Sequence, residues 1–152
     1  ILAGKVGSNL ASELGTMRVT EQIDALEIMG VNTFSYLIGP KLAAAIIMVP
    51  ILVVIAAATG IYGGLLAGEL TGYVSSEDYM QGVLMGFLQK NINVMLIKAT
   101  VFGFIITSIS CYQGFYASGS ALEIGKASTE AVVVSSIFLI VVNFFVAFFL
   151  LG

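Results

Sequence analysis

The chain has 152 residues, of which 59% are hydrophobic and 10% are charged, and its net charge is −3 at pH 7. Soluble domains usually carry about 25% charged residues, so this composition is typical of an integral membrane protein. The chain has no basic cluster to support nucleic-acid binding, no histidine and a single cysteine, which excludes disulfide scaffolds and multi-cysteine metal sites.

Three long runs of the chain carry no charged residue: 42–68, 99–122 and 131–152. Each run is longer than the roughly 20 apolar residues that a helix needs to cross a bilayer core. Three such helices in so short a soluble chain would leave no surface to face water. The sequence therefore predicts an all-α integral membrane protein whose three full transmembrane helices cover 41–68, 96–115 and 131–151.

Two segments precede the first of these spans, and the earlier one is rich in small residues. Small residues let membrane helices pack closely, so we expect residues 1–12 to be the end of a preceding membrane helix. The chain starts at Ile1, without an initiator Met or a signal region. We interpret it as a fragment that lacks the N-terminal part of its domain.

Residues 13–30 hold the densest charge of the chain and predict a short amphipathic helix that Thr20 can cap. Acidic residues at three-residue spacing share one face of this helix, and they are Glu21, Asp24 and Glu27. Apolar residues fall on another face: Val19, Ile23, Leu26 and Met29. Two interpretations stay open, a solvated connector and a docking helix on the membrane surface that presents its acidic face to a soluble partner.

The first span, 41–68, contains a proline and has a glycine-rich second half. Pro50 removes one backbone hydrogen bond and predicts a bend, which neighbouring helices can accommodate in a membrane. The glycines are Gly60, Gly63, Gly64 and Gly68, and the last two have the GxxxG spacing that allows a close helix partner. We expect helix packing along this strip, with a lipid or substrate groove as the alternative.

Polar segments separate the remaining spans. Residues 77–90, preceded by two candidate capping serines, mix apolar and polar side chains and predict an interfacial helix. Lys98 is placed near the entrance of the second span, where its side chain can reach the headgroups. The far end of that span, 107–113, is polar and should face other helices or a cavity. Residues 116–130 are expected to form a polar loop.

The basic residues orient these segments. Four of the six lie on one side of the predicted membrane: Lys5, Arg18, Lys41 and Lys126. The positive-inside rule therefore places 13–40 and 116–130 in the cytosol and 69–95 outside.

No complete set of catalytic or nucleotide-binding residues is present. Carboxylate pairs occur only in hydrophilic segments, without a histidine, a cysteine pair or a nucleophile elbow. The stretch 119–126 is one residue too long for a P-loop, and Ala127 replaces the required Ser or Thr. No ionisable residue is predicted at mid-depth of a span, which argues against a proton-coupled carrier. We expect a chain that is not an enzyme and binds no cofactor or metal, so that any ATP-driven action needs a partner.

Four stretches together resemble the MlaE family of ABC permeases, in family order and across essentially the whole chain. They are ELGTMRVTEQIDALEIMG at 13–30, Pro40 with the span ending GIYGG at 60–64, LIKATVFG through SCYQG at 96–114, and GKASTEAVVVSS at 125–136. The first is long and specific. The chain departs from the family where Pro is common, at Thr33, and where Arg is common, at Lys5, Lys126 and Glu130.

The resemblance implies a homodimeric, polytopic permease of the bacterial inner membrane, or of the plastid inner envelope, that moves phospholipids between inner and outer membranes. Its partners would be a cytosolic MlaF-like ATPase that binds ATP and Mg, a periplasmic MlaD-like MCE protein and, in some systems, a MlaB-like STAS protein. A scaffold that only anchors the MCE protein and an ion-coupled secondary carrier are the alternatives.

The resemblance also implies roles for two sets of residues. Residues 13–30 resemble the coupling helix of the family, so ATPase contact is expected from Glu13, Gly15, Arg18, Glu21, Asp24 and Glu27. Close packing at the dimer or at the lipid cavity is expected from Gly60, Gly63, Gly64 and Gly68.

Overall fold

The computed structural model describes the backbone of residues 1–152 and the side chains of residues 1–150 and 152. This backbone forms six α-helices and one short π-helix, and it contains no strand. In chain order the elements are α1 Leu2–Val19, α2 Gln22–Ile28, η1 Phe34–Ile38, α3 Gly39–Thr71, α4 Ser76–Gly86, α5 Gln89–Phe115 and α6 Ala121–Leu151. Three segments are long and apolar enough to cross a membrane: Phe34–Thr71, Gln89–Phe115 and Ala121–Leu150. The protein is therefore all-α and polytopic, as predicted.

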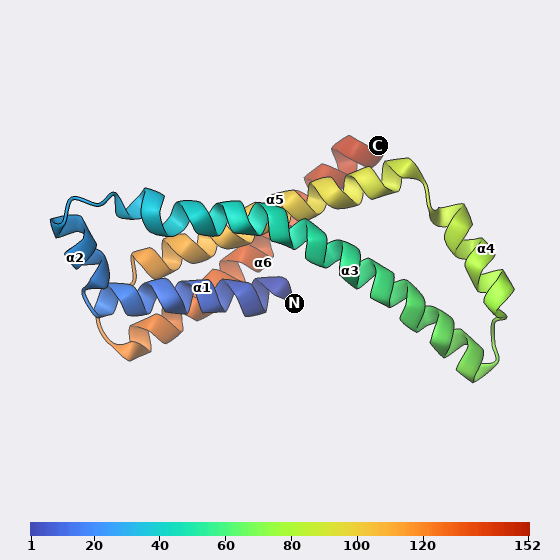
Figure 1. Ribbon diagram of the computed structural model, residues 1–152, viewed down its shortest axis with the longest axis horizontal. Helices are drawn as coiled ribbons and strands as arrows, with labels where there is room; N and C mark the ends of the chain where they lie inside the picture. The colour runs from blue at the N-terminus through green and yellow to red at the C-terminus, as the bar shows by residue number, and fades with distance from the viewer.

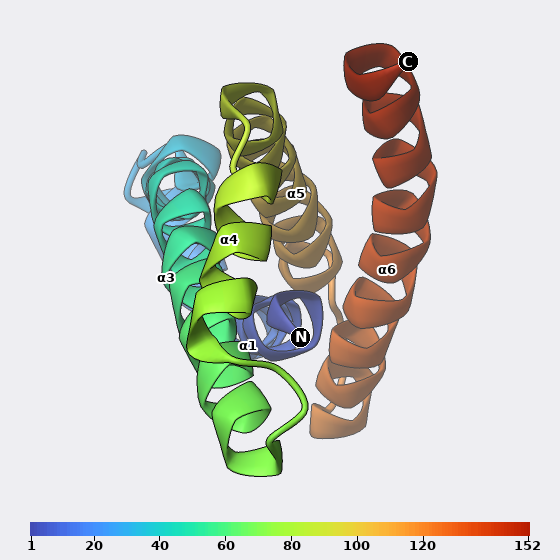
Figure 2. The same ribbon diagram turned by 90° about the vertical axis from the view of Figure 1, so that its right-hand side faces the viewer.

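The helices form a closely packed bundle at one end of the molecule and separate at the other (Figure 1). At the packed end α1 lies against α5 and α6, and α5 also packs against α3 and α6. At the open end the second half of α3 diverges from the start of α5, and α4 runs between them (Figure 1). Figure 2 shows the C-terminal half of α6 standing apart from α3 and α4. The predicted cytosolic segments lie at the packed end and α4 at the open end.

Small residues set the distance between the packed helices. A Cβ added at Gly7 of α1 would lie 3.0 Å from the Ser110 Oγ of α5. A Cβ at Gly103 of α5 would lie 3.1 Å from the carbonyl oxygen of Ala45 in α3. Lipid tails are as apolar as the helices, so close van der Waals packing of this kind drives helix association in membranes.

α5 is the inner helix of the bundle. In its most apolar window 39% of the residues are buried within the chain, against 6% for each of the other two spans. The polar end of α5 explains this difference, because Thr107, Ser110 and Cys111 are buried between helices. The prediction that this polar stretch faces other helices is confirmed for these residues, although Tyr112 is exposed. The outer faces of α3 and α6 are left for lipid or for other subunits.

The predicted helix over 13–30 is wrong in its bounds. α1 continues without a break to Val19, because Thr20 N–H still bonds the carbonyl oxygen of Thr16. Thr20 is not the cap of the next helix, since its hydroxyl also donates to that carbonyl, at 2.7 Å. Glu21 then takes a left-handed conformation, with φ 61°, and α2 starts at Gln22. After this change of direction, α2 leads from the end of α1 toward the start of α3 (Figure 1).

The other spans are longer than predicted. α3 covers Gly39–Thr71, with Pro40 in its first turn and Pro50 inside it, and Figure 1 shows that the helix changes direction along its length. α4 ends at Gly86 and is capped by Ser75, whose hydroxyl accepts a hydrogen bond from Asp78 N–H. α6 starts at Ala121, after Gly119 with φ 106° and the N-cap residue Ser120, so most of the predicted loop at 116–130 is helical.

The early start of α5 at Gln89 corrects the placement of Lys98. The prediction put Lys98 at the entrance of a span that begins at residue 96. In the structure Lys98 lies about two and a half turns inside α5. Residues 89–95 extend this helix, and α4 ends earlier than expected, at Gly86.

Candidate functional site

Arg18, in the last turn of α1, joins three elements at the packed end of the bundle. Its Nη1 lies 3.0 Å from Asp24 Oδ1 and 3.8 Å from Glu27 Oε1, both on α2. Its guanidinium also lies 5.2 Å from the centre of the Phe115 ring at the end of α5, which is within the range of a cation–π interaction. We call Arg18 and Phe115, with Asp24 and Glu27, the Arg18 junction.

An apolar contact fixes α2 at the same place. Ile23 is fully buried in a cluster with Leu14 of α1, Ile38, and Cys111 and Phe115 of α5. The opposite side of α2 is open, since Ile28 is 86% exposed and Met29 is 69% exposed. α2 therefore has a buried face that rests on the bundle and an exposed face without a partner in the described chain.

The structure divides the predicted acidic face. Asp24 and Glu27 both approach Arg18 and keep about half of their side chains exposed. Glu21 stands apart, because its left-handed backbone removes it from the helical spacing that would have aligned it with them. Glu21 is exposed and forms no ion pair with any described side chain.

The remaining residues predicted for partner contact lie on α1. Glu13 Oε2 accepts a hydrogen bond from Lys41 Nζ at 2.8 Å, which ties α1 to the start of α3. Gly15 is buried, and a Cβ there would lie 3.4 Å from Ile124 of α6. The structure therefore brings all six predicted residues to one end of the molecule, where Gly15 packs inside the bundle and the charged residues lie at its surface.

The predicted glycine strip of α3 is mostly open in this chain. Gly60 and Gly63 have no described atom within 4 Å of an added Cβ. Gly64 lies under Tyr79 of α4, whose hydroxyl donates a hydrogen bond to the Ile61 carbonyl oxygen at 2.9 Å. A Cβ added at Gly68 would lie 3.8 Å from the Cβ of Val74. Within the described chain, the strip packs only against the α3–α4 turn and α4.

A groove lies between α3 and α5 near the open end. It consists of two adjoining pockets of about 510 and 370 Å³ that share Asn91 and Met95. Most of its lining is aliphatic or aromatic, and it includes Val53, Val94, Met95, Lys98 and Phe102. We call this feature the α3–α5 groove.

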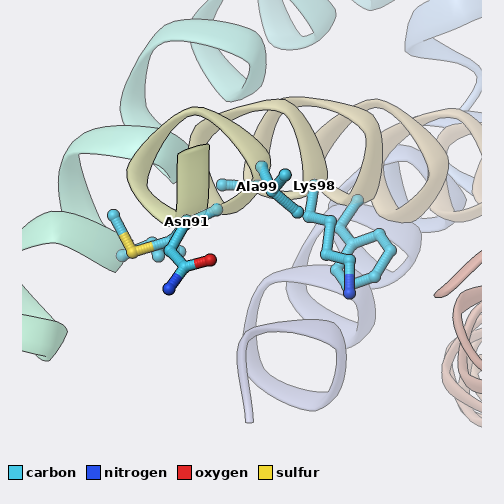
Figure 3. Close-up of a pocket in the computed structure, with 7 residues that line it drawn as sticks. Asn91, Lys98 and Ala99 are labelled. Atoms are coloured by element: carbon cyan, nitrogen blue, oxygen red, sulfur yellow. The ribbon is translucent and has the colours of Figure 1, made fainter. Parts of the chain in front are cut away.

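Lys98 is the cation of this groove. Figure 3 shows Lys98 and Asn91 extending from the same side of α5. None of the described carboxylates forms an ion pair with the Lys98 ammonium. A charged side chain without a partner is costly at membrane depth and usually faces a cavity or marks a functional pathway. The groove thus combines apolar walls with one positive charge.

Sequence reasoning missed the position of Lys98 within its helix and the pairing of Arg18. Lys98 was assigned to the membrane surface because the apolar run alone set the start of its helix. Arg18 was grouped with the acidic residues as a partner contact, although a cation six residues before Asp24 and nine before Glu27 could have suggested pairing across a turn.

Comparisons with known proteins agree on one family. The model of a family described as Permease MlaE matches residues 1–149. A probable ABC transporter permease protein of Rickettsia bellii is 42% identical over 146 residues, which cover 96% of this chain and 56% of that protein. A probable ABC transporter permease protein of Synechocystis is 36% identical over 148 residues, 97% of this chain and 56% of its own length.

A plant relative extends this comparison. The chloroplastic protein TRIGALACTOSYLDIACYLGLYCEROL 1 of Arabidopsis thaliana is 33% identical over 149 residues, which cover 98% of this chain and 43% of that protein. The chain spans about half the length of the curated relatives it matches.

Proposed function

The chain belongs to the MlaE family of ABC transporter permeases, and on that premise we propose that it carries phospholipids between the inner and outer membranes of a bacterial envelope. In this proposal it is a multi-pass subunit of the inner membrane and works as a homodimer. A separate cytosolic ATPase binds ATP and Mg²⁺ and drives transport. A periplasmic MCE protein and a STAS protein complete the assembly.

The observation that carries the lipid proposal is the unpaired Lys98 in the α3–α5 groove. Apolar walls suit acyl chains, and a cation in a poorly hydrated place favours an anionic group such as a phosphate. The groove is also bounded by α3, most of whose apolar surface is free to meet lipid. The name of the Arabidopsis relative refers to a glycerolipid, which agrees with a lipid substrate.

α2 is the proposed contact with the ATPase. Its position at the packed end, with Ile28 and Met29 exposed beside the unpaired Glu21, suits insertion into a groove of a soluble partner. Glu13, Gly15, Arg18, Asp24 and Glu27 are proposed to support this contact from the same end. Gly60, Gly63 and Gly68 are proposed to pack near the second protomer or the lipid path, since Gly60 and Gly63 have no neighbour within the described chain.

The position of Lys98 inside α5, a helix long and apolar enough to cross a membrane, also favours a second candidate function, an ion-coupled carrier. An ionisable residue inside a span is typical of proton-coupled transporters. The two candidates differ in their source of energy. Lipid transfer that needs ATP hydrolysis and is insensitive to a protonophore supports the ABC transporter, and the opposite result supports the carrier. Full assembly with an MCE protein but no lipid transfer would leave a scaffold role.

The groove is tested in the full-length permease, purified with its co-expressed ATPase and reconstituted in vesicles of phosphatidylethanolamine and phosphatidylglycerol. We expect Lys98→Glu to reduce ATP-dependent transfer of a fluorescent phosphatidylglycerol by about tenfold, because it places an anion against the lipid phosphate. Lys90→Glu is the matched control, since Lys90 starts the same helix and does not line the groove. Equal transfer by the two variants would contradict the proposal.

A further inference from the structure

We propose that Arg18 is a positioning residue that joins α2 to the C-terminal end of α5, so that these two segments move as one body and α5 carries the movement to the α3–α5 groove. This inference rests on the proposed function, because it names the route by which the ATPase acts on the lipid path. The order of elements along the chain would suggest another route, through α3, since the next elements after α2 are η1 and α3.

The side of the junction that faces α2 has two ion pairs. Arg18 Nη1 lies 3.0 Å from Asp24 Oδ1 and 3.8 Å from Glu27 Oε1, so one nitrogen of the guanidinium faces two acidic positions on successive turns of α2. Thr33, a buried residue after α2, donates a hydrogen bond to Glu27 at 3.4 Å. A lysine would keep the positive charge but not the planar guanidinium that lies against the Phe115 ring.

The side that faces α5 is the Phe115 ring. Phe115 is 6% exposed, and it receives the Arg18 guanidinium at 5.2 Å and the edge of the Phe34 ring at 5.5 Å. Ile23 of α2 belongs to the same buried cluster. α2 is therefore connected to α5 in two ways, through the charged Arg18 side chain and through the apolar packing of Ile23. A displacement of α2 would be transmitted to α5 through both contacts.

α5 links this junction to the groove without interruption. It is one helix from Gln89 to Phe115, and residues of its first half line the α3–α5 groove: Val94, Met95, Lys98 and Ala99. A continuous helix transmits an axial or tilting movement as a rigid element, whereas α3 contains Pro50 between α2 and its own groove residues. This difference favours α5 over α3 as the route.

The test uses the full-length permease with its ATPase in vesicles of phosphatidylethanolamine and phosphatidylglycerol, and measures the lipid transferred per ATP hydrolysed. Arg18→Gln removes the junction, and Phe115→Leu removes the ring but leaves both ion pairs. We expect both variants to bind the ATPase and hydrolyse ATP, with a yield of lipid per ATP lowered about fivefold or more, in the range of typical coupling between sites. Arg18→Lys, which keeps a cation, should lie between them and the parent.

Lys126→Gln is the matched control, because it removes an ion pair of similar kind, Lys126–Glu123, at the packed end without touching α2 or Phe115. An unchanged yield of lipid per ATP in Arg18→Gln would overturn the proposal. So would loss of ATPase binding in both Arg18→Gln and Phe115→Leu, which would make the junction a requirement for docking.

A distance measurement tests the rigid body directly. Spin labels are placed at the exposed positions Gln22 of α2 and Tyr112 of α5, with the buried Cys111 replaced by alanine. We expect one narrow distance distribution that is the same without nucleotide and with ATP trapped by vanadate, and a broader one in Arg18→Gln. A distance that changes between the two states in the parent protein would overturn the proposal. If the parent complex moves no lipid, the proposed function fails, and the distances still decide the role of the junction.

Discussion

Gly114 of α5 lies directly against the backbone of Ala11 in α1. A Cβ added at Gly114 would lie 2.6 Å from the carbonyl oxygen of Ala11 and 2.9 Å from the Cβ of Leu14. This close approach places Phe115 beside the last turns of α1, where Arg18 and Ile23 meet it. The Arg18 junction therefore depends on the absence of a side chain at Gly114.

Gly114→Ala is expected to destabilise the bundle. The added methyl group must push α1 away from α5, and overpacking of this kind typically costs about 1–3 kcal/mol. Gly82→Ala on α4 is the control, since Gly82 is exposed and an added Cβ there meets nothing within 4 Å. Thermal unfolding of the full-length protein in detergent should show a lower Tm for Gly114→Ala alone. Equal Tm values for the two variants would contradict the packing described for α1 and α5.

Gly64→Ala is expected to disturb the packing of α4 on α3, mainly through the hydroxyl oxygen of Tyr79. A Cβ at Gly64 would collide with the Tyr79 hydroxyl, which bonds the Ile61 carbonyl oxygen. Tyr79→Phe removes that hydroxyl and costs about 0.5–1.5 kcal/mol as a lost hydrogen bond. The two changes should be less than additive, because Tyr79→Phe relieves the collision. A double-mutant cycle on unfolding free energies measures the coupling, and strict additivity would show that the two residues do not touch.

Ile23→Ala is expected to release α2 from the bundle. Ile23 is fully buried, and truncation of a buried isoleucine typically costs about 2–5 kcal/mol. Ile28→Ala on the same helix is the control, because Ile28 is 86% exposed. Limited proteolysis within 20–33 should be faster for Ile23→Ala than for Ile28→Ala. Equal cleavage rates would show that the buried face of α2 does not hold it in place.

Glu21→Arg is expected to weaken ATPase binding without lowering the stability of the permease. Glu21 is exposed and has no partner among the described side chains, so its replacement disturbs no internal contact. Charge reversal at the rim of an interface typically changes the association rate and its salt dependence. Surface binding assays with the purified ATPase should show slower association, while the Tm stays the same. Normal association would remove Glu21 from the proposed interface.

The sequence predicted those features that depend on neighbouring residues. Three uncharged apolar runs were sufficient to identify three spans, because a helix must satisfy its own backbone groups inside a bilayer. The serine cap of α4 follows from local backbone chemistry in the same way. The helix bounds were less accurate where polar residues continue a helix beyond its apolar run, as at Gln89 and Ala121.

The sequence by itself thus determined that this protein is a helical membrane protein, which segments cross the membrane and to which family of permeases the chain belongs. Only the tertiary structure decided that Arg18 pairs with Asp24 and Glu27, that Glu21 is left free, and that Lys98 lines a groove. The hydropathy of a segment is a sum over neighbouring residues, so it does not depend on which other helices that segment contacts. Pairing and burial depend on contacts between helices distant in sequence, and here these are set by how closely small residues let the helices approach.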